Sequence, residues 1–131
     1  MIRTINLRRF WLVTGVALVA AVIYLSIAPR LDAPDVPGGD KVGHFVAYGA
    51  VMLWFMQAAL SRGSRALIGL TLVALGIALE FVQAGIPGRS FEIADMFANS
   101  IGVAIGWLAA PPRTPNFLAA LSSALARGTA R

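Results

Sequence analysis

The stretch ALIGLTLVALGIALEFVQAGIPGRSFEIADMFANSIGVAIGWLAA, residues 66–110, decides the fold. It consists of two apolar runs, residues 66–85 and 91–110, separated by IPGRS. A helix of about 20 residues is about 30 Å long, which matches the hydrocarbon core of a bilayer, and it satisfies its own backbone hydrogen bonds as lipid requires. Pro87 and Gly88 favour a turn between the runs. The stretch therefore predicts an antiparallel transmembrane hairpin.

Two further apolar runs precede this hairpin, at residues 10–28 and 44–60. The 131-residue chain is 58% hydrophobic and only 13% charged, which is too apolar for a soluble domain of this length. Cysteine is absent, so disulfides and thiolate metal sites are excluded. We therefore expect an all-α fold in which residues 1–131 form one domain, a membrane-spanning four-helix bundle.

Small residues and a capping residue add detail to this expectation. Ala98, Gly102 and Gly106 recur every four residues, a spacing that lets membrane helices approach closely. After Pro115, Asn116 can cap a short amphipathic helix, with a frayed tail as the alternative.

Charge separates the two ends of the expected bundle. Eight of the eleven basic residues precede the first run, or follow the second or fourth: Arg3, Arg8, Arg9, Arg62, Arg65, Arg113, Arg127 and Arg131. The six acidic residues lie in or beside the other two connections: Asp32, Asp35, Asp40, Glu80, Glu92 and Asp95. Because basic segments stay on the cytoplasmic side, we expect both termini there and the acids at the outer face. The first run is longer than the apolar region of a usual signal peptide, and Pro29 would directly follow the cleavage site, where it disfavours cleavage. We therefore expect this segment to be retained.

Polar side chains from three expected helices lie at a similar depth in the membrane, near this outer face. Glu80 and Gln83 share a helix face, as do Asp95 and Asn99, and all four lie one or two turns from the hairpin turn. His44 opens the second run on the same side. We interpret His44, Glu80 and Asp95 as candidate catalytic residues. The candidate ligand-binding residues are Asp40, Lys41, Gln83, Arg89 and Asn99.

Structural interpretations compete with this functional one. Arg89 can form a two-pronged pair with Glu80 or Asp95, which would hold the hairpin together. Asn99 can join two helices by a hydrogen bond, and Glu92 is expected to be a solvated acid in the first turn of its helix. The functional interpretation therefore rests on the convergence of these residues and on no single one of them.

The order of the polar residues resembles that of a known family. The segments DKVGHFVAY (40–48), EFVQ (80–83), PGRSFEIAD (87–95) and NSIG (99–102) together resemble the VanZ-like family of small bacterial integral membrane proteins, over about residues 40–110. The resemblance implies a multi-pass protein of the bacterial cytoplasmic membrane, whose motif residues are the eight candidates above. The family takes its name from a protein linked to resistance to the glycopeptide teicoplanin, and it implies no reaction.

Mixed charge at an outer interface predicts a site for a lipid headgroup or a cell-envelope precursor, whether binding or catalytic. The alternative is an accessory or regulatory membrane protein whose polar cluster is structural. Proton or ion movement is disfavoured because the inner halves of the spans carry few polar groups. A metal site from Asp40, His44, Glu80 and Asp95 has no established ligand spacing, so we expect no cofactor. The expected partners are membrane lipids, a lipid-linked precursor or a membrane protein, and not nucleic acid.

Overall fold

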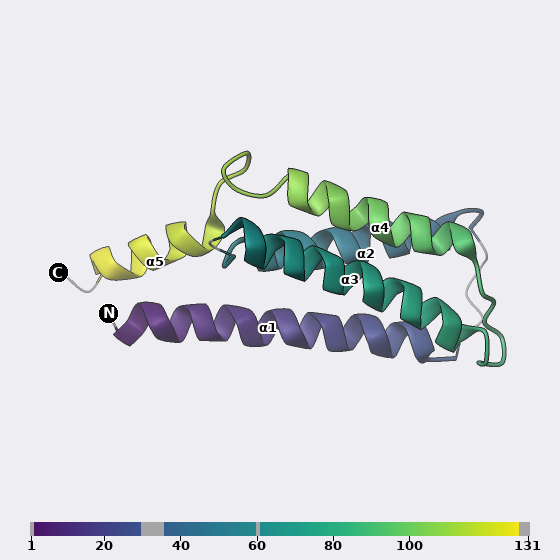
Figure 1. Ribbon diagram of the computed structural model, residues 1–131. Helices are drawn as coiled ribbons and strands as arrows, with labels where there is room; N and C mark the ends of the chain where they lie inside the picture. The colour runs from purple at the N-terminus through teal and green to yellow at the C-terminus, as the bar shows by residue number, and fades with distance from the viewer. Residues whose placement is uncertain (1, 30–35, 60, 129–131) are drawn as a thin grey trace.

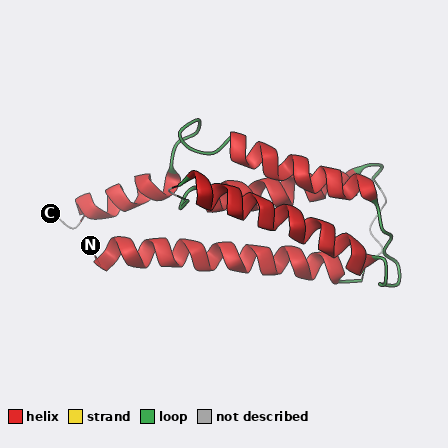
Figure 2. Ribbon diagram, viewed as in Figure 1, coloured by secondary structure: helices red, strands yellow, loops and turns green. Residues whose placement is uncertain are grey.

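The computed structural model describes residues 2–29, 36–59 and 61–128, and within them every regular element is an α-helix (Figure 2). The five helices are α1 (Ile2–Ile27), α2 (Gly39–Met56), α3 (Arg62–Gln83), α4 (Ile93–Leu108) and α5 (Phe117–Gly128). The all-α prediction is confirmed. Some charged residues that the topology prediction used lie outside the described residues or have side chains that are not described: Arg3, Arg30, Asp32, Asp35 and Arg131.

The first four helices lie side by side and alternate in direction, while α5 lies beyond them next to the start of α1 (Figure 1). The α1–α2 and α3–α4 connections share one end of the molecule. The α2–α3 and α4–α5 connections share the other end, where α1 begins. This arrangement agrees with the predicted antiparallel hairpin and places the polar residues of α2, α3 and α4 near the same end.

Two helices are long and apolar enough to cross a membrane: residues Asn6–Ile27 of α1 and Arg62–Gln83 of α3. Helix α4 has only 16 residues, and α2 includes the charged Asp40 and Lys41 because it begins at Gly39, before the predicted residue 44. The start of α2 is set by Gly38, whose φ of 75° suits glycine. The four-span arrangement therefore stays a prediction for α2 and α4.

The closest helix pair is α2 with α4, and glycines make it possible. A Cβ added to Gly106 would lie 2.5 Å from the Gly49 oxygen, and one added to Gly102 would collide with the Phe45 oxygen. Both glycines belong to the predicted small-residue stripe, which thus packs on α2. Around this contact the core is formed by Tyr48, Met52, Met56, Leu72 and Val103.

Tryptophan side chains hold α1 against α2 at the end away from the polar residues. The rings of Trp11 and Trp54 stack with centroids 3.9 Å apart and an interplanar angle of 7°. Trp11 Nε1 donates to the Trp54 main-chain oxygen at 3.0 Å, and Trp54 Nε1 donates to the Trp11 main-chain oxygen at 2.9 Å. This reciprocal pairing satisfies both polar ring atoms while their apolar faces pack, so α1 has a fixed lateral position.

Helix α5 begins as the sequence predicts. Asn116 Oδ1 accepts from the Ala119 N–H at 2.8 Å, which is an N-cap hydrogen bond. Gln57, at the end of α2, accepts from the Phe117 N–H at 2.8 Å, and Asn116 Nδ2 donates to the Gln57 main-chain oxygen at 3.1 Å. Helix α5 is therefore anchored to α2 through its first turn.

Replacement of Gly102 by alanine tests the α2–α4 contact. The new methyl group would meet main-chain atoms of Phe45 and Gly49, which cannot rotate away, so we expect Gly102→Ala to lower the free energy of unfolding by about 1–3 kcal/mol. Gly43→Ala is the matched control in α2, because its Cβ would meet nothing within 4 Å. Thermal unfolding of the detergent-purified variants measures both. Equal stability of the two variants would contradict the close contact.

Candidate functional site

Lys41 joins the start of α2 to the start of α4. Its Nζ lies 2.6 Å from Glu92 Oε2, 3.3 Å from Asp40 Oδ2 and 3.4 Å from Asp95 Oδ1. The hydrogen bond to Glu92 raises the pKa of Lys41 above its usual range, so the ammonium group stays charged at physiological pH. Glu92 was predicted to be a solvated acid; its side chain is partly exposed, and it also pairs with Lys41.

His44 lies one turn further along α2 and contacts two side chains of α4. Its Nδ1 is 3.0 Å from Asn99 Oδ1, and its Nε2 is 3.6 Å from Asp95 Oδ2. A carbonyl oxygen of an amide can only accept, so Nδ1 carries the proton and donates it to Asn99. Asn99 and Asp95 are both buried. The interhelical role expected for Asn99 is confirmed, and His44 Nε2 is left facing Asp95.

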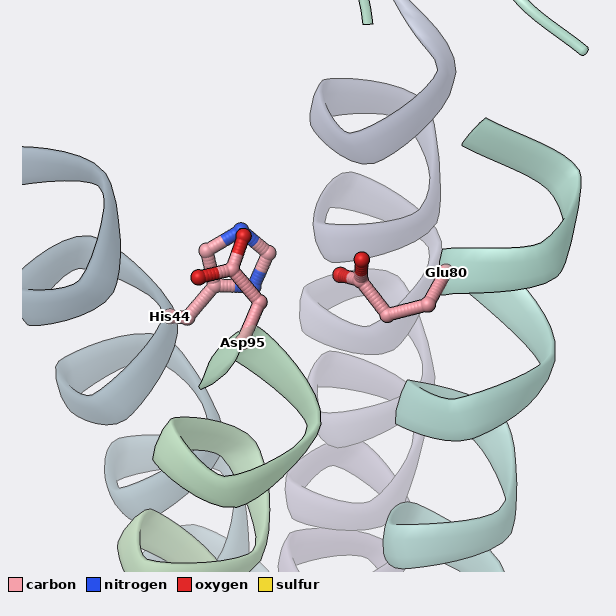
Figure 3. Close-up of side chains that lie close together, drawn as sticks. All are labelled: His44, Glu80 and Asp95. Carbon is pink, nitrogen blue, oxygen red and sulfur yellow. The ribbon is translucent and has the colours of Figure 1, made fainter. Parts of the chain in front are cut away.

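Glu80 approaches this pair from α3 and is almost fully buried, with 1% of its surface exposed. Its Oε2 accepts from the Glu92 N–H at 3.1 Å, which links the end of α3 to the start of α4. Its Oε1 has no hydrogen-bond partner among the described residues. Figure 3 shows the Glu80 carboxylate directed toward His44 and Asp95. The three candidate catalytic residues are thus brought together from three helices.

Gln83 and Arg89 make their contacts with α1. Gln83 Nε2 donates to the Ser26 oxygen at 2.9 Å, and the Arg89 guanidinium donates to the Leu25 oxygen at 2.7 Å and the Ala28 oxygen at 2.8 Å. The last carbonyls of a helix lack partners within it, and a cation is favoured there. The predicted pairing of Arg89 with Glu80 or Asp95 is wrong, because its donors bind these carbonyls and the described ion pairs include neither contact.

A cavity of about 350 Å³ lies beside the cluster, between α1, α2 and the end of α3. Its wall includes apolar and polar side chains, among them Val22, Leu25, His44, Tyr48, Gln83 and Arg89. Sequence analysis did not select Tyr48, which is 2% exposed and whose hydroxyl has no hydrogen-bond partner among the described residues. The signal was its spacing: Tyr48 follows His44 by four residues and therefore shares its helix face.

Two helices that are long and apolar enough to cross a membrane, α1 and α3, with a buried polar cluster at one end, are typical of a membrane protein. The sequence model of the VanZ/LLP1 family matches residues 1–117. This chain belongs to that VanZ-like family.

A curated relative is the uncharacterized protein C11E3.10 of Schizosaccharomyces pombe (strain 972 / ATCC 24843). The two are 30% identical over 105 residues, which is 78% of this chain and 63% of the relative, so the chain spans less than two thirds of that protein's length. No solved structure matches the chain. Similar sequences therefore occur outside bacteria, and a bacterial origin for this chain stays a prediction.

Replacement of Asn99 by leucine tests the His44–Asn99 hydrogen bond. Leucine has a similar volume but leaves the His44 Nδ1–H without its acceptor, so we expect the free energy of unfolding to fall by about 1–3 kcal/mol. Ser100→Ala is the control, because Ser100 Oγ bonds only to the Met96 oxygen of its own helix among the described contacts. Chemical denaturation in detergent measures the difference. A larger loss in Ser100→Ala would refute the assignment.

Proposed function

We propose that the chain is a multi-pass membrane protein whose α1 to α4 all span the bilayer, with both termini in the cytoplasm. Its cavity and polar cluster at the outer end would bind the polar head of a lipid or of a lipid-linked cell-envelope precursor. The observation that carries this proposal is the mixed lining of the 350 Å³ cavity. Leu25 and Val22 offer apolar surface to a chain, while His44, Gln83 and Arg89 line the same space.

The exposed surface of α1 supports a membrane setting. Phe10, Val13, Val16 and Tyr24 are each more than 60% exposed, and only 6% of the residues in the best apolar window of α1 are buried. In water such a surface would be strongly unfavourable, whereas lipid chains cover it without cost. Helices α2 and α4 are shorter, but α2 packs against both candidate spans and α4 packs against α3, and we propose that they cross with them.

The charge distribution supports the proposed orientation. At the end where α1 begins, Arg8 donates to the Ala58 oxygen at 3.3 Å, and Arg65 donates to the Pro111 oxygen at 2.7 Å. Arg62 and Arg113 line a second cavity at the same end. The described carboxylates lie near the opposite end, around Lys41 and His44. A basic end favours the cytoplasm, so the cluster would face outward.

Three side chains of the cavity wall could interact with a bound headgroup: His44, Tyr48 and Arg89. His44 lines the cavity and sits 3.6 Å from Asp95, so it can exchange a proton with a hydroxyl or phosphate group there. Tyr48 offers a buried hydroxyl that the protein itself leaves without a described partner. Arg89 adds positive charge to the wall while its donors hold α1. These groups suit an anionic or sugar-containing head better than an apolar ligand.

A second candidate function is favoured by the same contacts. Gln83, Arg89 and Asn99 each bond to another helix, so much of the polar set holds the helices together. A non-catalytic accessory protein that recruits a membrane partner requires only that these polar contacts hold its helices together. The two candidates differ in what they require of the cavity: only the first requires that it be filled by a ligand. A link to glycopeptide resistance stays an implication of family membership.

Cysteine labelling tests the proposed orientation, because the natural chain has no cysteine. Ser90 in the α3–α4 connection and Gly63 near the α2–α3 connection are both exposed. We expect a membrane-impermeant maleimide added to whole cells to label Ser90→Cys, and to label Gly63→Cys only after the cells are opened. The reverse pattern would overturn the orientation, and equal labelling of both sites in whole cells would overturn the spanning arrangement.

Filling the cavity tests ligand binding. A Cβ at Gly43 meets nothing within 4 Å, and Gly43 lines the cavity, so we expect Gly43→Leu to place new atoms in the ligand space. We expect binding of a polyprenyl-diphosphate-linked sugar or of phosphatidylglycerol in nanodiscs to weaken about tenfold, or about 1.4 kcal/mol. Gly128→Leu, in open space on α5, is the control and should bind as wild type.

His44→Gln completes this test, because it keeps a polar side chain but removes the proton-exchanging ring. Loss of binding in Gly43→Leu and His44→Gln, with unchanged thermal stability, would support the headgroup site. Wild-type binding in both folded variants would instead favour the accessory function. Binding that is lost equally in Gly128→Leu would show that the assay reports general damage to the protein.

A further inference from the structure

We propose that His44, Glu80 and Asp95 form a divalent cation site, with zinc or manganese as the ion that their chemistry suits best. The three side chains come from α2, α3 and α4, and one ligand atom of each lies within 4.8 Å of the others (Figure 3). The three positions follow no established metal-ligand spacing, so the sequence alone did not favour a metal site. Helix packing supplies the convergence that sequence spacing lacks.

An unpaired buried oxygen is independent support for a ligand at this point. Glu80 is 1% exposed, and its Oε1 has no hydrogen-bond partner among the described residues. The carboxylate cannot turn away freely, because its Oε2 is held by the Glu92 N–H at 3.1 Å. A buried carboxylate oxygen without a partner is strongly unfavourable, so such atoms in proteins usually meet a proton, a water or a cation.

The second ring nitrogen of His44 is held as a metal ligand requires. Nδ1 donates to Asn99 Oδ1 at 3.0 Å, which leaves the lone pair of a neutral ring on Nε2, the atom that faces Asp95. Metal-binding histidines almost always donate their other N–H to an oxygen in this way, which fixes the ring orientation. Asn99 would therefore be a positioning residue for the metal ligand.

The charges around the site also favour a cation. Lys41 contacts Asp40, Glu92 and Asp95, and none of the described ion pairs reaches Glu80. Four carboxylates thus lie near Lys41, whose described ion pairs are with three of them, while Arg89 lines the small cavity beside the cluster. The group formed by Asp40, Glu92 and Asp95 could also be considered, but Lys41 already occupies the space that a cation would take there.

The ligand set narrows the choice of ion. One imidazole nitrogen with two carboxylates suits zinc or manganese, whereas calcium and magnesium prefer oxygen ligands alone. Ligand atoms around zinc lie about 3–3.5 Å apart, so ligand atoms up to 4.8 Å apart need to close by up to about 1.5 Å. Three protein ligands leave a coordination position open. A small cavity of about 20 Å³, lined by His44 and Asp95 among others, leaves room for a water molecule beside them.

Metal content and affinity test the site without any lipid. The detergent-purified protein is dialysed against Zn²⁺ or Mn²⁺, and bound metal is measured by mass spectrometry and titration calorimetry. We expect about one ion per chain, and at least about 100-fold weaker binding in Glu80→Gln and His44→Gln, since even outer-shell changes weaken metal sites about 10–100-fold. Glu92→Gln is the matched control, a nearby carboxylate outside the trio whose backbone N–H is retained.

Several outcomes would overturn the proposal. Metal binding below one ion in ten chains would overturn it. An equal loss of metal affinity in Glu92→Gln and Glu80→Gln would also overturn it, because it would show that the ion is attracted by surface charge alone. If Glu80→Gln does not fold, His44→Gln and a Co²⁺ absorption spectrum carry the test, because imidazole ligation changes that spectrum. If added Zn²⁺ or Mn²⁺ does not raise the stability of the wild-type protein, Glu80 carries a proton in place of a metal ion, and the proposal fails.

Metal binding does not depend on the proposed headgroup function, but the open coordination position would extend it. His44 belongs both to the trio and to the wall of the larger cavity, so a phosphate oxygen held there could reach the ion. This extension rests on the proposed function. Metal binding with no effect of metal on lipid affinity would end the extension and leave the cation site standing.

Discussion

The close approach of α2 and α4 is the contact on which the polar cluster depends. Gly49, Gly102 and Gly106 carry no side chain, so main-chain atoms of the two helices touch, and any Cβ at Gly102 would collide with Phe45. This contact fixes both the distance and the axial register of the helices. One turn from the contact, the same register places His44 opposite Asn99 and Lys41 opposite Glu92. A wider helix separation would break these hydrogen bonds together.

The polar side chains fall into two groups by what they contact. Gln83 and Arg89 bind the last carbonyls of α1, and Asn99 binds His44, so these residues use their donors and acceptors on the protein itself. Glu80 Oε1 and the Tyr48 hydroxyl are buried without a described partner. The first group joins α1 to the end of α3 and to the α3–α4 connection, and joins α2 to α4. The second group marks where a ligand can add a contact that the fold does not supply.

The cavity arises from the same division of roles. Gln83 and Arg89 hold the end of α1 by its backbone, and the α1 side chains Val22 and Leu25 form one wall of the cavity. His44 and Tyr48 form part of the opposite wall. An apolar wall next to polar atoms, at the end of candidate membrane spans, is the basis of the proposed headgroup site. Family membership agrees with a membrane setting but names no ligand.

The sequence by itself determined the helices, the breaks between them and the level of the polar residues. Apolar runs bounded by proline and glycine predicted α1 to α4, and of the two alternatives left open for the tail, the helix capped by Asn116 is the one that forms, as α5. Helical periodicity was enough to place Glu80 with Gln83, and Asp95 with Asn99, near one end. The small residues at 102 and 106 correctly predicted a close helix contact, although the partner helix was not specified.

Only the tertiary structure decided which atoms meet. A pair of Arg89 with Glu80 or Asp95 was one prediction, yet the described contacts join Arg89 to the carbonyls of Leu25 and Ala28, because a helix end offers acceptors that no side-chain pattern reveals. Glu92 was expected in solvent, and its partly exposed side chain also pairs with Lys41 of α2. Tyr48 was missed because its burial depends on how α1 docks. Periodicity fixes the face and depth of a residue, whereas its partner depends on the rotation and spacing of neighbouring helices, which here the glycine contact sets.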